Sequence, residues 1–144
     1  MSTVFKAFAF DLGGTLVEWS GLTLNWSEYY VQAFNLVRST LSLNLDSDAI
    51  AKAITILEKY NARINPREVE FSANHIFSEA TTTWELGAHS ADDVALCFYS
   101  FFQENMKVFP DATPLLSTLS KNGSKIGILT DLATGMPEEM VYEA

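Results

Sequence analysis

Apolar residues recur at every third or fourth position through most of the middle of the chain. This spacing places them along one face of a helix, and it predicts four helices in succession. The predicted helices cover residues 27–43, 47–65, 66–86 and 91–106. Their starts carry the capping residues Ser27, Asp46 and Ser90, and Gly87 follows the end of the third helix. The fourth helix is apolar on most of its surface, so it should be buried on several sides.

Short, mostly apolar runs near both ends of the chain predict two strands. The first covers residues 4–10 and is followed by Gly13 and Gly14, a pair that is typical of a tight turn. The second covers residues 124–129, and a helix beginning at Thr113 precedes it. Strand, helix and strand in this order predict a βαβ unit with parallel strands and a right-handed crossover.

The fold class predicted from these elements is α/β, with a partial Rossmann-like core and an inserted α-helical subdomain. The core consists of residues 1–17 and 108–144, and the insertion consists of residues 18–107. The insertion is too long for a simple connection between neighbouring elements, so we assign it to a subdomain of its own. A short further helix is expected from Pro137.

Composition narrows the range of partners. Of the 144 residues, 48% are hydrophobic, which predicts a folded core, and the formal net charge is −9. This charge disfavours nucleic acids and anionic membranes as partners because both attract basic patches. It is compatible with a bound divalent cation. Cys97 is the only cysteine and no apolar stretch reaches transmembrane length, so we expect a cytoplasmic protein in a reducing setting.

The candidate catalytic residues stand where the two predicted strands end. Asp11 follows the first strand, and Thr130 and Asp131 follow the second. In open parallel sheets, binding sites form outside the carboxyl ends of the strands. A carboxylate in that place can act as a nucleophile or a metal ligand, or it can cap the turn. Thr130 can likewise be an ordinary β-branched residue at the end of a strand.

Two segments resemble the haloacid dehalogenase superfamily of phosphohydrolases, in its helical-cap branch. The family's nucleophile motif is similar to the sequence FDLGGTL at residues 10–16. Its cap exit and its second motif are similar to VFPD at residues 108–111 and IGILTD at residues 126–131. An apolar helical insertion of fitting size separates the two segments, so the resemblance in architecture covers the whole chain.

This resemblance implies a mechanism. Asp11 would attack phosphorus and form an aspartyl-phosphate, which water then cleaves. A Mg²⁺ ion, held by the Asp11 carboxylate and the Gly13 carbonyl, would neutralise charge during the transfer. The substrate would be a small phosphorylated metabolite selected by the cap. Its phosphate would be bound by Thr130, Asp131 and the backbone N–H groups of Leu12, Gly13 and Gly14.

The chain departs from the family's pattern at Gly13, where the family's phosphatases carry a second Asp as general acid and base. Glycine cannot exchange a proton, and general acid–base catalysis contributes about 10²–10⁴-fold. Family branches that cleave carbon–halogen or carbon–phosphorus bonds also lack this Asp, and the second of these branches uses a cap lysine as a Schiff-base amine. Lys52 and Lys59 lie on a predicted helix of the insertion, and we interpret both as surface residues.

A second departure concerns the later motifs of the family, a Lys or Arg and an acidic pair carried by further strands. Only 13 residues follow Asp131. We expect either a fragment of a longer phosphohydrolase or a complete chain whose first strand has an exposed edge. An exposed hydrophobic edge pairs with other chains, so the second case predicts self-association.

Two other functions fit part of the sequence. Sugar kinases of the actin-like ATPase fold share Asp-Leu-Gly-Gly-Thr in a β-hairpin that holds ATP phosphates, and this fold requires a return strand directly after the turn. A non-catalytic protein that keeps the fold and binds a phosphate ligand would explain Gly13. We interpret the tryptophans as packing residues, with a place in the cleft between cap and core as the alternative. These residues are Trp19, Trp26 and Trp84.

Overall fold

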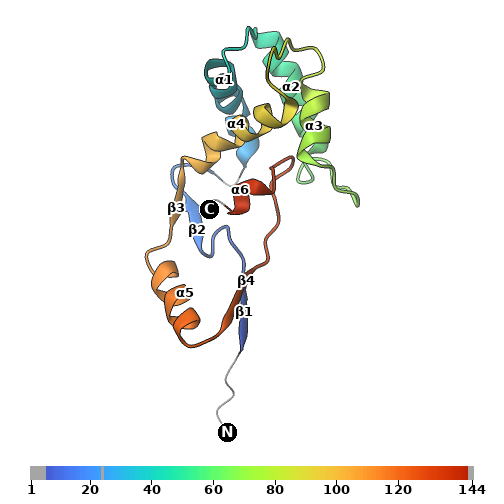
Figure 1. The fold of residues 1–144 in the computed structure, drawn as a ribbon. Coiled ribbons are helices and arrows are strands. Elements are labelled where there is room, and N and C mark those ends of the chain that lie inside the picture. Colours follow the sequence, from blue (N-terminus) through green and yellow to red (C-terminus); the bar gives the residue numbers. More distant parts are fainter. Residues whose placement is uncertain (1–5, 24, 143–144) are drawn as a thin grey trace. The chain divides into compact units, whose positions relative to one another are not determined.

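The computed structural model describes residues 6–23 and 25–142 and divides the chain into two compact units (Figure 1). The first unit contains Met1–Gly21 and Asn105–Asp131, and the second contains Leu22–Glu104 and Leu132–Ala144. Strands lie in the first unit and most helices in the second, which confirms the predicted α/β class. The beginning of the first predicted strand, residues 4–5, lies outside the described residues.

A parallel pair of strands forms the centre of the first unit. β1 (Ala7–Phe10) pairs with β4 (Lys125–Ile128), in a register that sets Ala7 opposite Lys125 and Phe10 opposite Ile128. The helix α5 (Ala112–Lys121) leads into β4 (Figure 1). The parallel pairing is the one that the order of strand, helix and strand predicted.

An antiparallel pair of short strands also belongs to the first unit. β2 (Val17–Trp19) pairs with β3 (Met106–Val108). The pairing continues on one side, where the Phe109 amide donates to the Leu16 carbonyl at 2.9 Å. The sequence predicted a connection at β2 and a helix as far as residue 106. The helix observed there, α4 (Ala91–Gln103), ends earlier. The residues that follow it form backbone hydrogen bonds with the β2 segment instead of continuing the helix.

A small apolar cluster holds the first unit together. Its buried members are Leu16, Val17 and Ala112. Partly buried apolar side chains pack against them from both strand pairs and from α5. These are Phe10, Leu12, Trp19, Met106, Phe109 and Leu116. Burial of this kind is the main favourable contribution to folding, and here it fixes the side chain of Trp19 near the loop that follows β1.

Helices form the second unit around a core of aromatic rings. The helices are η1 (Trp26–Tyr29), α1 (Tyr30–Thr40), α2 (Ser47–Tyr60), α3 (Ala73–Ala80), α4 (Ala91–Gln103) and α6 (Glu139–Tyr142). The ring of Phe98 on α4 lies 4.7 Å from that of Phe34 and 5.5 Å from that of Phe77, and all three side chains are fully buried. Among the described residues, no helix is long and apolar enough to cross a membrane.

Capping side chains mark the starts of α2 and α4, whereas α1 begins at Tyr30 without a side-chain cap and the predicted cap Ser27 lies in η1. The Asp46 carboxylate accepts from the Ala49 amide at 2.7 Å at the start of α2. Ser90 and Asp93 form a reciprocal capping box at the start of α4, in which each side chain accepts from the other residue's amide. The backbone donors left over at a helix start are thereby satisfied.

The third predicted helix, over residues 66–86, was too long. The helix observed there, α3, begins only after Ser72, whose hydroxyl accepts from the His75 amide at 3.2 Å. The segment before it is a loop in which Arg67 donates to the Val69 carbonyl at 2.8 Å and pairs with Glu70 at 2.6 Å. Val69 fitted the apolar spacing of a helix, but its side chain is 63% exposed.

The segment after Asp131 packs with the helices of the second unit, although its position in the sequence predicted that it belongs to the core. The buried hydroxyl of Tyr99 donates to the Thr134 carbonyl, and burial raises the pKa of this tyrosine well above its usual value. Met140 on α6 is buried as well. The assignment of the two units as core and cap stays a prediction.

Candidate active site

The parallel pairing brings the predicted site residues to one edge of the sheet. The amide of Leu129 donates to the carbonyl of Phe10 at 2.9 Å, which continues the ladder past the ends of both strands. Asp11 directly follows β1, and Thr130 and Asp131 follow Leu129. All three therefore lie at the carboxyl edge of the strand pair, where open α/β sheets form their sites.

The loop after Asp11 is closed by its own backbone. The carbonyl of Leu12 accepts from the amides of Leu16 at 2.8 Å and Val17 at 3.1 Å. The amide of Gly14 donates to the Val17 carbonyl at 2.7 Å, and Gly14 has a φ of 77°, a conformation that favours glycine. Because its N–H group is already bonded within the loop, Gly14 is a poorer candidate for donating to a phosphate than the motif predicts.

The carboxylate of Asp11 is open to solvent. Its residue is exposed, and the hydroxyl of Thr15 donates to Oδ2 over 3.5 Å, which is long for a hydrogen bond between oxygens. Thr130 is half-buried, and its hydroxyl donates to the Asp131 carbonyl at 3.4 Å. Neither weak bond holds its side chain tightly, so both side chains remain able to turn toward a ligand.

The indole of Trp19 fills the space beside Gly13. A Cβ atom placed on Gly13 would lie 2.8 Å from Cζ3 of this ring and 3.0 Å from Cη2. Carbon atoms pack at about 3.5–4.0 Å, so a side chain at position 13 would fit only if the partly buried ring shifted. Gly13 does not have a positive φ. The restriction on a side chain at this position therefore comes from the neighbouring ring and not from the backbone.

The donors available for a metal ion at this edge are oxygen atoms. The described residues contain no group of three or more His, Cys, Asp or Glu side chains that is placed to hold an ion. No backbone hydrogen bond within residues 10–20 ends on the carbonyl of Gly13. One carboxylate and one carbonyl, completed by water and substrate oxygens, form a donor set that fits Mg²⁺, which prefers few protein ligands and keeps several waters.

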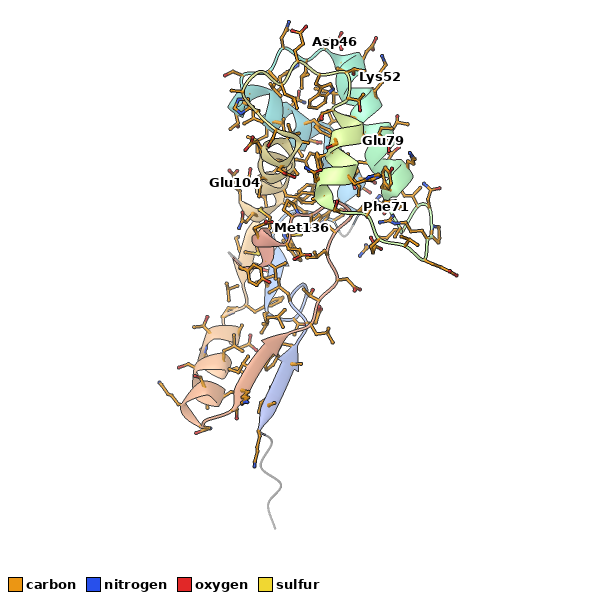
Figure 2. The ribbon with its side chains drawn as sticks, turned by 45° about the vertical axis from the view of Figure 1, so that its right-hand side comes forward. Asp46, Lys52, Phe71, Glu79, Glu104 and Met136 are labelled. Atoms are coloured by element: carbon orange, nitrogen blue, oxygen red, sulfur yellow. The ribbon has the colours of Figure 1, made fainter. Side chains whose placement is uncertain are left out.

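The cap lysines do not have the surroundings of a Schiff-base amine. Lys59 on α2 pairs with Glu79 on α3 at 2.6 Å, and this hydrogen bond raises the pKa of Lys59 (Figure 2 labels Glu79). A Schiff base requires a neutral amine, which a lowered pKa provides. Lys52 is exposed on α2, as Figure 2 shows. The predicted surface role of both lysines agrees with these contacts.

Sequence reasoning missed the relation between Trp19 and Gly13. The two residues are six positions apart, and only the turn between them together with the β2–β3 pairing carries the indole back to Gly13. Neither strand had a recognisable apolar pattern. No signal in the sequence identified this contact.

Comparison with known proteins agrees with the motifs at this edge. A model of the haloacid dehalogenase-like hydrolases matches residues 5–143. A comparison with curated proteins gives no match. Since the family match spans nearly the whole chain, the chain belongs to the haloacid dehalogenase-like hydrolases.

The strand pairing does not meet a requirement of the sugar-kinase alternative. It required the strand after the Gly pair to return along β1 as a hairpin. In the described part of the chain, β2 pairs with β3, and β1 pairs with β4.

Proposed function

We propose that this chain is a Mg²⁺-dependent phosphoryl-transfer hydrolase of small phosphorylated metabolites, with Asp11 as the nucleophile. The observation that carries the proposal is the placement of Asp11 and Thr130 at the same carboxyl edge, one after each strand of a parallel pair. Membership of the hydrolase family supports it. An exposed carboxylate at the same strand edge as a hydroxyl donor suits attack on a phosphoryl group whose oxygens need hydrogen bonds.

Each residue at the edge has one role in this proposal. Asp11 attacks phosphorus, and the Thr130 hydroxyl donates to a phosphoryl oxygen. The amides of Leu12 and Gly13 bind the phosphate, together with Asp131 at the end of the second strand. Splitting the hydrolysis through an aspartyl-phosphate replaces one difficult step by two easier ones.

Mg²⁺ would be held by the Asp11 carboxylate and the Gly13 carbonyl. When bound, it supplies positive charge that offsets the charge on the transferring phosphoryl oxygens. The chain's formal charge of −9 favours such a cation and repels an anionic substrate without it.

Hydrolysis of 4-nitrophenyl phosphate with and without Mg²⁺ tests the proposal. This ester has a good leaving group and needs little help from an acid. We expect turnover that chelation removes, that Asp11→Asn abolishes and that Thr130→Val lowers by about 10²-fold, the cost of losing one oxyanion donor. The matched control is Asp48→Asn, which removes an exposed carboxylate from α2 in the second unit. Equal turnover in the parent and Asp11→Asn would refute Asp11 as the nucleophile.

A non-catalytic role is the second candidate, and Gly13 favours it because glycine cannot donate a proton and the ring of Trp19 lies where a side chain at this position would begin. In this case the chain binds a phosphate ligand without cleaving it. Binding of inorganic phosphate by the parent, together with no turnover of any ester, would establish this function in place of the first.

Self-association through the first strand stays a prediction. In the described part of the chain, β1 hydrogen-bonds with β4 on one edge, and no strand pairs with its other edge. Unpaired edges recruit further strands. Light scattering over a range of concentrations measures the mass in solution, and a monomer at every concentration would contradict the prediction.

A further inference from the structure

One edge of β4 presents backbone groups that no strand in the described part of the chain pairs with. β4 pairs with β1 on its other edge, where the amide of Leu129 donates to the carbonyl of Phe10 at 2.9 Å. Successive residues of a strand direct their N–H and C=O groups to opposite edges. Those of Ile126, Ile128 and Thr130 therefore point away from β1, toward the free edge.

The side chains along this free edge are apolar and exposed. The exposed fraction is 37% for Ile126, 45% for Ile128 and 77% for Leu129. Free edges are usually protected by a charged residue, a proline or a bulge, and residues 126–130 contain neither a charged residue nor a proline. The edge is therefore a surface that suits a further strand.

We propose that two copies of this chain pair antiparallel along β4, in a register that sets Lys125 of each copy beside the partner's Asp131. Two identical strands related by a two-fold axis in one sheet run antiparallel. The sequence KIGILTD at residues 125–131 has a base at one end, an acid at the other and Ile128 at its centre. With Ile128 opposite its own copy, Ile126 faces the partner's Thr130, and the base of each copy faces the acid of the other.

Charge selects this register over its neighbours. A pairing centred on Gly127 would set Lys125 opposite the partner's Leu129, and one centred on Leu129 would set it opposite the partner's Ala133. All three registers use the backbone groups of the free edge, but only the one centred on Ile128 pairs opposite charges. Such cross-strand pairs stabilise a sheet, and like charges in these positions destabilise it.

The free edge of β1 lacks this match. Two-fold pairing within a sheet keeps facing side chains on the same side of the sheet, so it joins positions that are an even number of residues apart. Lys125 and Asp131 meet this condition because six positions separate them. Lys6 and Asp11, which flank β1, are five positions apart and cannot face each other in such a pair.

The pairing also places a positive charge at the carboxyl edge of the sheet. Residues 11–16 and 129–131 contain two aspartates and neither lysine nor arginine, so this edge by itself repels a phosphate. The partner's Lys125 offsets the charge of Asp131. This effect on the site rests on the proposed function, whereas the pairing of the two copies does not.

Oxidative cross-linking of the full chain tests the register. In a Cys97→Ser background, Ile128→Cys sets a thiol opposite its own copy, and the Cα atoms of such a hydrogen-bonded pair are about 5.5 Å apart, within the range of a disulfide. Ile126→Cys is the matched control because it lies on the same face of β4 but four positions, or about 13 Å, from its own copy. We expect a linked dimer with Ile128→Cys and none with Ile126→Cys.

Charge reversal followed by analytical ultracentrifugation tests the contact between Lys125 and Asp131. The parent should have the mass of two chains at high concentration. Lys125→Glu should raise the dissociation constant by about 10-fold or more, and adding Asp131→Lys should restore the dimer. Lys121→Glu makes the same change of charge on α5 and should leave the dissociation constant unchanged. Turnover of 4-nitrophenyl phosphate per chain should fall when the parent is diluted below this constant.

The outcomes separate the pairing from the function of the site. A monomer at every concentration overturns the inference, while turnover that depends on Asp11 would keep the proposed function. Cross-linking through Ile126→Cys, or through Ala9→Cys on β1 in place of Ile128→Cys, overturns the register. Equal dissociation constants for Lys125→Glu and Lys121→Glu overturn the charge contact. A dimer whose turnover per chain does not change on dilution overturns the effect on the site alone. If Lys125→Glu does not fold, cross-linking decides.

Discussion

The close approach of Trp19 to Gly13 predicts a large energetic coupling between these positions. In Gly13→Ala, the new methyl group would lie 2.8 Å and 3.0 Å from two ring carbons, well inside ordinary contact. Overpacking of this kind costs about 1–3 kcal/mol. The lower entropy of the unfolded chain offsets about 0.4–1 kcal/mol of that cost because the φ of Gly13 is not positive. We expect a net loss of up to about 2.6 kcal/mol in the free energy of unfolding.

The second variant of the cycle removes the ring. Trp19→Ala should itself cost less than the roughly 3–5 kcal/mol of a fully buried aromatic residue because Trp19 is only partly buried. In that background, Gly13→Ala should be neutral or stabilising. The coupling energy between the two positions is then about 1–3 kcal/mol.

The assay is urea denaturation followed by far-UV circular dichroism, with hydrogen exchange of the β1 and β4 amides as a local readout of the first unit. Gly127→Ala is the matched control, since Gly127 lies on β4 without a positive φ and a Cβ there would meet nothing within 4 Å. The reasoning is refuted if Gly13→Ala is as stable as Gly127→Ala. It is refuted equally if the loss in Gly13→Ala persists after Trp19 has been removed.

Further predictions concern the second unit. Tyr99→Phe removes the donor to the Thr134 carbonyl and should lower the free energy of unfolding by about 0.5–1.5 kcal/mol, the net contribution of one hydrogen bond. Urea denaturation measures this loss, and an unchanged midpoint would show that the bond contributes nothing. Ser90→Ala removes the side chain that accepts from the Asp93 amide and should cost about 1 kcal/mol in the same assay, with loss of exchange protection confined to the first turn of α4. Hydrogen bonds from Lys59 and Tyr60 lower the pKa of Glu79 below its usual value. The ionised Glu79 therefore stabilises the fold at pH values above the pKa that it has in the unfolded chain. This stabilisation is lost as the pH falls through the pKa that Glu79 has in the folded chain. The difference in urea midpoint between the parent and Glu79→Gln should therefore be largest near neutral pH and shrink in acid, and a difference that does not vary with pH would contradict this assignment.

Much of the architecture follows from local patterns in the sequence. The unbroken apolar run of β1 and the repeating apolar positions of α2 and α4 are strong signals, and the structure contains all three elements. Asp46 and Ser90 were expected at helix starts, and both accept hydrogen bonds from backbone amides there. These features depend on residues near one another in the chain.

The features that sequence reasoning missed depend on contacts between distant residues. β2 and β3 have three residues each. They are stabilised by pairing with each other, although the whole helical insertion separates them in the sequence. The loop before α3 is stabilised by the contacts of Arg67, which overrode a spacing that fits a helix. Asp11 and Thr130 could be predicted as site residues because they end strands. Trp19 could not, because its position depends on the β2–β3 pair.

The most direct test of the central claim is to locate the phosphoryl group on the chain. The chain is incubated with acetyl phosphate and Mg²⁺, quenched in acid, cleaved into peptides and mapped by mass spectrometry. The account predicts one added phosphoryl group on the peptide that contains Asp11, with none in Asp11→Asn. Phosphorylation at another residue that persists in Asp11→Asn would contradict the assignment of Asp11 as the nucleophile.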